Sequence, residues 1–178
     1  MVVTEVSSPP RPRSPAAARL LEGARHDGTL IEPLVGVLCP PDLVASIEGR
    51  AAVIRAGVPT HVIVRGVTAR WLWTGGAPPR LADLAVTRQW RTGIRKHLAV
   101  VPSSYDVDTS WRGLVVASPR QLVVDAACAA DEAAVHGLLG ALAPTGLRPA
   151  DALAHASAQR QLTGVPAARR LLARLVAE

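Results

Sequence analysis

Short apolar runs, separated by proline- and glycine-rich turns, divide this chain into strand-sized and helix-sized segments. In the stretch GLVVASPRQLVVDAA, residues 113–127, the apolar run Leu114–Val116 precedes Ser118 and Pro119, and apolar residues then recur at helical spacing. Ser118 can cap a helix by accepting a hydrogen bond from an amide of its first turn, and Pro119 fits the first helical position. The stretch therefore predicts a strand that enters a helix through a capped turn, with the other segments arranged around it.

Periodicity along the whole chain predicts an α+β fold. We expect a helix plus β-hairpin, the remnant of a winged helix, and then a small mixed or antiparallel sheet packed with a C-terminal helical bundle. The expected helices cover 15–24, 43–56, 66–73, 119–128, 131–141, 149–157 and 165–176. The expected strands cover 29–31, 35–38, 61–64, 84–87, 98–101 and 111–117, and a polar loop covers 102–110.

Three regions follow from this pattern. Residues 1–13, with three prolines and no periodicity, predict a disordered tail. Residues 14–40 predict the truncated winged-helix-like segment, and residues 41–178 predict one α/β domain.

Composition and charge limit the classes of protein to which this chain can belong. The formal net charge is +6, from 20 Lys and Arg against 14 Asp and Glu, which favours an anionic partner. Only one of the cations is lysine, so part of the arginine content reflects a GC-rich genome. No apolar run approaches the roughly 20 residues that span a bilayer, and we expect a cytoplasmic protein without a membrane partner. Cys39 and Cys128 lie far apart without a CxxC context, which predicts two buried structural thiols rather than a disulfide.

The densest basic run, residues 88–97, is the strongest candidate for DNA binding. Arginine can bind phosphate or guanine, and a tryptophan can stack on a base. We expect a hairpin here, and the alternative is a solvated hairpin whose tryptophan folds back to the core. The candidate DNA-binding residues are Arg88, Trp90, Arg91, Arg95, Lys96 and His97, with Arg65 and Arg70 as extensions of the same face.

Two other features leave alternatives open. Arg120 and Asp125 are five residues apart on the predicted helix, so they need not pair with each other. Either they hold the fold together or they bind a ligand, and the structural role is the stronger interpretation. Trp71 and Trp73 cannot share one helical face, so we expect one in the core and the other at a surface or partner contact.

The motifs of common enzymes are missing from the sequence. A PD-(D/E)xK nuclease needs an acid two residues before its lysine, but Ile94 holds that place before Lys96. No HxxH pattern, Walker loop or GxSxG elbow is present. We therefore expect no enzymatic activity, no cofactor and no metal.

Two segments resemble one known family. The pattern Gly113, Ser118, Pro119, Arg120 and Asp125, with Gln121 where threonine is usual, is similar to a structural motif of AbiEi-type antitoxins from abortive-infection (type IV) toxin–antitoxin systems. The segment VRGVTARWLWTG, residues 64–75, resembles a helix of the same family, and the resemblance covers roughly residues 16–175 in the form common in actinobacteria.

The resemblance implies a transcriptional regulator that binds double-stranded DNA at its own promoter. It also implies that the protein counters a nucleotidyltransferase toxin, without necessarily contacting that toxin. We expect a truncated winged helix and no C-terminal nuclease domain. A homodimer, a non-enzymatic protein–protein interaction module and a remnant of a nuclease fusion remain alternatives.

Overall fold

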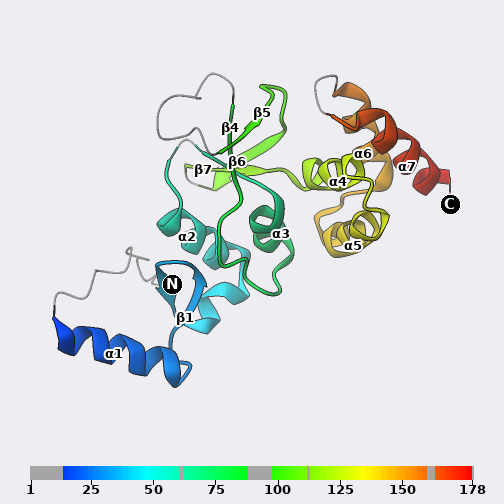
Figure 1. Cartoon of the computed structure of the whole chain (residues 1–178). Helices are drawn as coiled ribbons and strands as arrows, with labels where there is room; N and C mark the ends of the chain where they lie inside the picture. Colours follow the sequence, from blue (N-terminus) through cyan, green and yellow to red (C-terminus); the bar gives the residue numbers. More distant parts are fainter. Residues whose placement is uncertain (1–13, 61, 88–97, 112, 160–162, 178) are drawn as a thin grey trace.

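A five-stranded mixed sheet lies at the centre of the molecule (Figure 1). The computed structural model describes residues 14–60, 62–87, 98–111, 113–159 and 163–177. The strand order is β5-β4-β3-β7-β6, and helices flank the sheet, so the expected α+β class is confirmed. The strands are β3 (Ile63–Val64), β4 (Leu84–Thr87), β5 (Ala99–Val101), β6 (Val107–Trp111) and β7 (Leu114–Ala117).

The observed strands bear on two predictions. β4 and β5 pair in parallel, with Ala85 opposite Ala99, whereas a hairpin requires antiparallel strands. β4 and β5 are therefore not the two arms of a hairpin, while the hairpin expected over 88–97 lies outside the described ranges and stays a prediction. The expected loop over 102–110 is wrong in its second half, because Val107 begins β6, which pairs antiparallel with β7. β6 carries polar residues on an edge of the sheet, so it lacks the apolar pattern of a strand.

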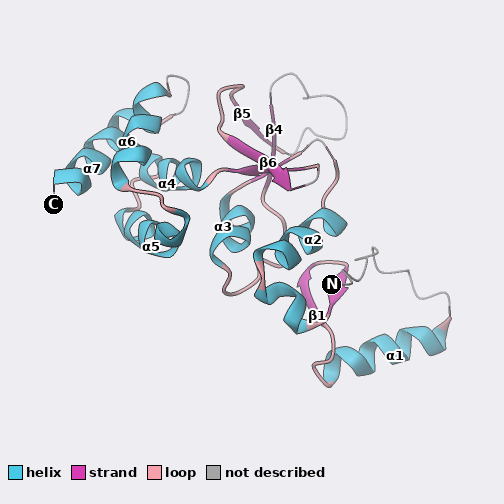
Figure 2. Cartoon of the chain, turned by 180° about the vertical axis from the view of Figure 1, so that it is seen from behind, coloured by secondary structure: helices cyan, strands magenta, loops and turns pink. Residues whose placement is uncertain are grey.

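The N-terminal part is a helix followed by a β-hairpin, as expected. Helix α1 (Pro15–His26) starts at Ser14, whose Oγ accepts a hydrogen bond from the Ala17 amide at 3.2 Å. Strands β1 (Ile31–Leu34) and β2 (Val37–Cys39) then pair antiparallel. α1 lies at one end of the molecule, away from the helical bundle (Figures 1 and 2).

Two helices lie together on one side of the sheet (Figure 2). The predicted helix 43–56 is instead a 3-10 turn, η1 (Pro41–Ala45), followed by α2 (Ile47–Gly57), because Ser46 caps α2 through the Gly49 amide. Buried Arg50 donates to the carbonyl oxygens of Val44, Ala45 and Leu72 at 2.9–3.1 Å. It thereby joins η1 and α2 to α3 (Gly66–Thr74).

The C-terminal bundle packs around α4. Its elements are α4 (Pro119–Cys128), α5 (Glu132–Leu142), η4 (Ala143–Thr145), α6 (Pro149–Ala158) and α7 (Val165–Ala177). α7 begins close to the end of α4, since a Cβ added to Gly164, at φ +84°, would lie 2.4 Å from the Cys128 carbonyl oxygen. Cys39 and Cys128 are both free, as expected, but only Cys39 is fully buried, and Cys128 is part-buried. None of the helices in the described ranges has the length and apolarity needed to cross a membrane.

Candidate functional site

The turn between β7 and α4 is fastened to the loop that precedes β6. Ser118 accepts from the Gln121 amide at 3.2 Å, and its hydroxyl donates to the Asp106 carboxylate. Arg120 donates to both oxygens of Asp106, from Nε at 2.7 Å and from a terminal nitrogen at 2.9 Å. This two-point ion pair holds the loop against the first turn of α4.

Asp125 lies at the other end of α4 and does not pair with Arg120. Its carboxylate accepts hydrogen bonds from the Tyr105 hydroxyl and from Gln121 Nε2, the latter at 2.8 Å. Burial raises the pKa of Asp125, although both hydrogen bonds favour its charged form. Burial also raises the pKa of Tyr105, which therefore remains a hydrogen-bond donor.

Helix α6 extends this cluster of polar groups. Gln121 Oε1 lies 2.9 Å from His155 Nε2 and accepts from the Asp106 amide at 3.2 Å. Gln159 exchanges two hydrogen bonds with Ser104, at 2.9 and 3.1 Å. We name the whole set the polar junction, because it connects the β5–β6 loop with α4 and α6: Ser104, Tyr105, Asp106, Ser118, Arg120, Gln121, Asp125, His155 and Gln159.

Charge in the polar junction is set by burial and by hydrogen bonds. Burial lowers the pKa of His155, which favours the neutral imidazole. Burial also opposes ionisation of Asp106, but the hydrogen bonds from Arg120 and Ser118 outweigh it and lower the pKa of that carboxyl group. The titratable side chains of the polar junction are therefore held by hydrogen bonds and ion pairs within the protein.

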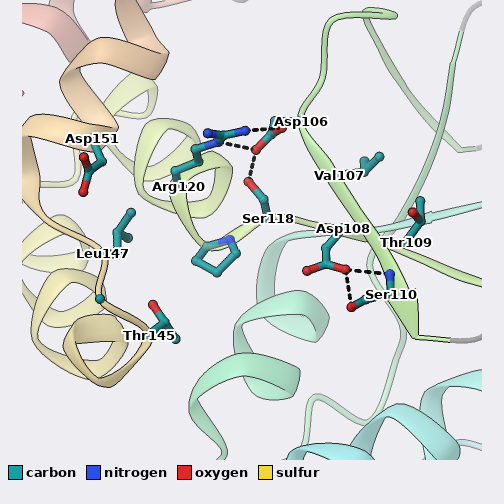
Figure 3. Close-up of a pocket in the computed structure, with 12 residues that line it drawn as sticks. Asp106, Val107, Asp108, Thr109, Ser110, Ser118, Arg120, Thr145, Leu147 and Asp151 are labelled. Atoms are coloured by element: carbon teal, nitrogen blue, oxygen red, sulfur yellow. Dashed lines mark hydrogen bonds and ion pairs between the residues drawn. The ribbon is translucent and has the colours of Figure 1, made fainter.

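A cleft of about 650 Å³ runs along β6, between that strand and the start of α6 (Figure 3). Arg120 and Ser118 form part of one wall, and Asp151 lies across from Asp108. Asp108 accepts hydrogen bonds from the amide and hydroxyl of Ser110 at 2.7 and 2.6 Å. The lining holds three carboxylates (of Asp106, Asp108 and Asp151) and one guanidinium, so it disfavours phosphate.

A second cleft, of about 340 Å³, lies near the end of α4. Arg65 lines it, and its Nε lies 3.6 Å from Asp83 Oδ1 and has no hydrogen-bond partner among the described residues. Tyr105 and Asp125, bonded to each other, line the same cleft, together with Cys128. Burial raises the pKa of the Cys128 thiol, which makes it a poor nucleophile. Neither cleft combines an activated nucleophile with a free general base among the described residues.

The predicted DNA-binding residues are divided by the structure. Arg65 is half-buried beside Asp83, whereas Arg70 is exposed on α3. The remaining candidates, which are Arg88, Trp90, Arg91, Arg95, Lys96 and His97, lie outside the described residues.

Both tryptophans of α3 serve the interior. Trp71 is only 2% exposed. Trp73 donates from its indole nitrogen to the Ala117 carbonyl oxygen at 2.9 Å and meets Trp111 edge to face, with ring centroids 6.0 Å apart. The expectation that one tryptophan lies in the core is confirmed, and the other is part-buried rather than displayed at a surface.

Sequence reasoning missed most of the polar junction. It treated Tyr105 and Asp106 as parts of a polar loop, placed Gln121 only in the motif, and gave no role to His155 or Gln159. One available signal was Gln121, a polar residue directly before the apolar run Leu122–Val124, and its side chain is fully buried. The pairing partners lie up to 55 residues apart, and no local pattern links them.

Within the described ranges, no group of three or more His, Cys, Asp or Glu side chains is placed to hold a metal ion. Comparison with protein-family models, curated proteins and solved structures finds no match to this chain. The resemblance to AbiEi-type antitoxins therefore stands on the two sequence motifs alone.

Proposed function

We propose that this protein is a non-enzymatic DNA-binding regulator of the AbiEi-antitoxin type, acting on its own promoter in a type IV toxin–antitoxin system. The observation that carries the proposal is the uneven distribution of charge along the chain. In this proposal the nucleotidyltransferase toxin is a functional counterpart rather than a bound partner.

The described ranges are electrically balanced. They contain 12 arginines and 12 Asp and Glu residues, so their formal charge is zero. The other segments contain eight cations and two carboxylates, which account for the whole net charge of +6. Four of these eight cations fall within residues 88–97: Arg88, Arg91, Arg95 and Lys96.

The balanced part also neutralises many of its own charges. Arg25, Arg65, Arg120, Arg148 and Arg174 each form an ion pair with a carboxylate. A polyanion is therefore attracted mainly to the unbalanced run between β4 and β5. The cleft along β6 is acidic, which supports DNA contact elsewhere on the molecule.

The test is fluorescence anisotropy with the upstream DNA and a scrambled duplex, at low and at moderate salt. The variant Arg91→Gln/Arg95→Gln/Lys96→Gln should weaken binding and reduce the salt slope by up to about 3, since each lost phosphate contact removes about 0.9. The matched control Arg55→Gln/Arg80→Gln/Arg170→Gln removes the same charge from side chains that have no hydrogen bond or ion pair in the described ranges.

The outcomes separate regulation from simple attraction. Tighter binding to the upstream DNA that persists at moderate salt supports a specific regulator. Equal binding to both duplexes that collapses with salt indicates counterion release alone. No binding at either salt, or equal losses in the two triple variants, refutes the proposal for residues 88–97.

A protein–protein interaction module is the second candidate function. The observation in its favour is the presence of strongly exposed apolar side chains in the described ranges, among them Leu20, Val35 and Leu81. Buried Trp71 cannot contribute to such a surface. This alternative would be favoured if the purified protein formed a stable complex with the nucleotidyltransferase toxin and did not bind DNA.

A further inference from the structure

The cleft of about 340 Å³ near the end of α4 lies where segments that are distant in the sequence meet. Its lining comes from the residue that precedes α3, from the end of β5, from the β5–β6 loop, from α4 and from the residue before Gly164. The volume is near the lower end of the range for small-molecule pockets. The cleft therefore suits a ligand of few atoms rather than a peptide.

Arg65 brings to this cleft a hydrogen-bond donor that the described residues do not satisfy. Its Nε is buried, and Asp83 Oδ1 lies 3.6 Å away, too far for a hydrogen bond. A buried polar group without a hydrogen bond is costly and uncommon in proteins. The planar fork of a guanidinium fits the two oxygens of a carboxylate. Arg65 is therefore placed to bind a carboxylate of a ligand.

Asp125 brings to the same cleft a charge that a positive group would stabilise. Each of its oxygens accepts one hydrogen bond, from Tyr105 or from Gln121, whereas a carboxylate has about four acceptor positions. Burial raises the pKa of Asp125, because the charged form is poorly solvated there. An ammonium group beside Asp125 would offset this loss of solvation.

The rest of the lining is mainly apolar and selects the remaining part of a ligand. Residues 100–102 contribute two valines and a proline, and Val100 is 39% exposed. The lining holds one guanidinium and one carboxylate, so its formal charge is zero. A simple anion is repelled by Asp125 and a simple cation by Arg65, whereas a zwitterion is attracted to both. An aliphatic α-amino acid combines these two charges with an apolar side chain.

We propose that this cleft binds an aliphatic α-amino acid, with its carboxylate on Arg65, its ammonium group on Asp125 and its side chain against residues 100–102. Tyr105 is a positioning residue, because its hydroxyl donates to Asp125. A bound amino acid would connect α3, β5 and α4, and it would stabilise the folded chain by mass action. The proposal goes beyond DNA binding and does not depend on it, because every test is made without DNA.

Isothermal titration calorimetry and thermal unfolding of the full chain test the class of ligand. The probes are L-leucine, L-isoleucine and L-valine at millimolar concentration, and at least one of them should bind and raise the Tm. The matched analogues of leucine are 4-methylpentanoate, which lacks the ammonium group, and 3-methylbutylamine, which lacks the carboxylate. Each analogue should bind about 10-fold or more weakly than leucine, since it leaves one charged group without its partner. Binding of none of the three amino acids, or equal binding of either analogue, would overturn the proposal.

Two variants test the charged groups. Arg65→Gln and Asp125→Asn retain polar side chains and should each weaken amino-acid binding by about 10-fold or more. Arg55→Gln removes the same charge from the exposed surface of α2 and should leave binding unchanged. Circular dichroism should show that each variant is folded. Wild-type affinity in Arg65→Gln would contradict the proposal, even if Asp125→Asn failed to fold.

The thiol of Cys128 reports the position of the ligand. Cys128 lines the cleft and is part-buried, whereas Cys39 is only 2% exposed. The thiol reagent DTNB should therefore react with Cys128 first, and Cys128→Ser should remove this reaction. A saturating amino acid should slow the reaction in the wild type but not in Arg65→Gln. An unchanged rate in the wild type, at a concentration that calorimetry shows to be saturating, would place the ligand elsewhere and refute the site.

Discussion

Helices α1 and α4 begin with the same device and differ in everything that follows. Each starts at a Ser-Pro pair, and in each the serine Oγ accepts from the amide three residues on at 3.2 Å. α4 buries five side chains and anchors the polar junction, while α1 buries none. The local signal thus sets where a helix begins, and only tertiary contacts decide whether it is a core element or a displayed surface.

The largest expected difference concerns one leucine on each helix. Leu122 on α4 is 4% exposed, and Leu122→Ala should lower the free energy of unfolding by about 2–5 kcal/mol because it leaves a cavity. Leu20→Ala on α1 should change it by less than about 0.5 kcal/mol in the monomer. Urea denaturation at low protein concentration measures both. Equal losses would mean that α1 is packed against the body.

The next effect concerns the hydrogen bond that the Tyr105 hydroxyl donates to Asp125. Tyr105→Phe keeps the ring but leaves a buried carboxylate oxygen with one partner fewer, which should cost about 1–3 kcal/mol. The variant should also raise the pKa of Asp125 further, because it loses a bond that favours the charged form. Denaturation of wild type and variant at neutral pH measures the loss, and an unchanged stability would show that this bond is not formed in solution.

A smaller effect should appear in the pH dependence of stability. Burial lowers the pKa of His155 below its ordinary 6.5, so the unfolded chain takes up a proton that the folded chain does not. This contribution to stability is complete above pH 6.5 and is lost as the pH falls through the folded-state pKa. His155→Gln should reduce the difference in stability between about pH 7.5 and about pH 5.5. The control His26→Gln, on exposed α1, should retain that difference.

The smallest predicted loss within the polar junction concerns the ion pair of Arg120 and Asp106. Arg120→Gln should cost about 1 kcal/mol or less, because the arginine is about half exposed and water screens its charge. The Asp106 pKa should rise, so that stability is lost at a higher pH during acid titration. Arg148→Gln, at the surface pair with Asp151, should leave the acid titration of Asp106 unchanged. If Asp106 titrates in Arg120→Gln as it does in the wild type, the ion pair with Arg120 does not lower the pKa of Asp106.

These contrasts also explain which parts of the fold and of the polar junction could be predicted from the sequence. Helix 119–128 and strand 84–87 were predicted at their observed bounds, because caps and apolar runs are local signals. Strand β6 was missed, since Asp108, Thr109 and Ser110 carry no apolar alternation. The parallel pairing of β4 and β5, which was not predicted, depends on long-range topology. The same holds for the polar junction, where Ser104 meets Gln159 across 55 residues.

The most direct test of the whole account compares Arg120 with the three cations at positions 91, 95 and 96, by the salt dependence of DNA binding. The account assigns Arg120 to the internal structure, and Arg91, Arg95 and Lys96 to DNA. Arg120→Gln should keep the wild-type affinity and salt slope while its unfolding shifts, and the triple variant at 91, 95 and 96 should lose affinity and slope while its unfolding stays unchanged. A reduced slope in Arg120→Gln together with a wild-type slope in the triple variant would contradict the account.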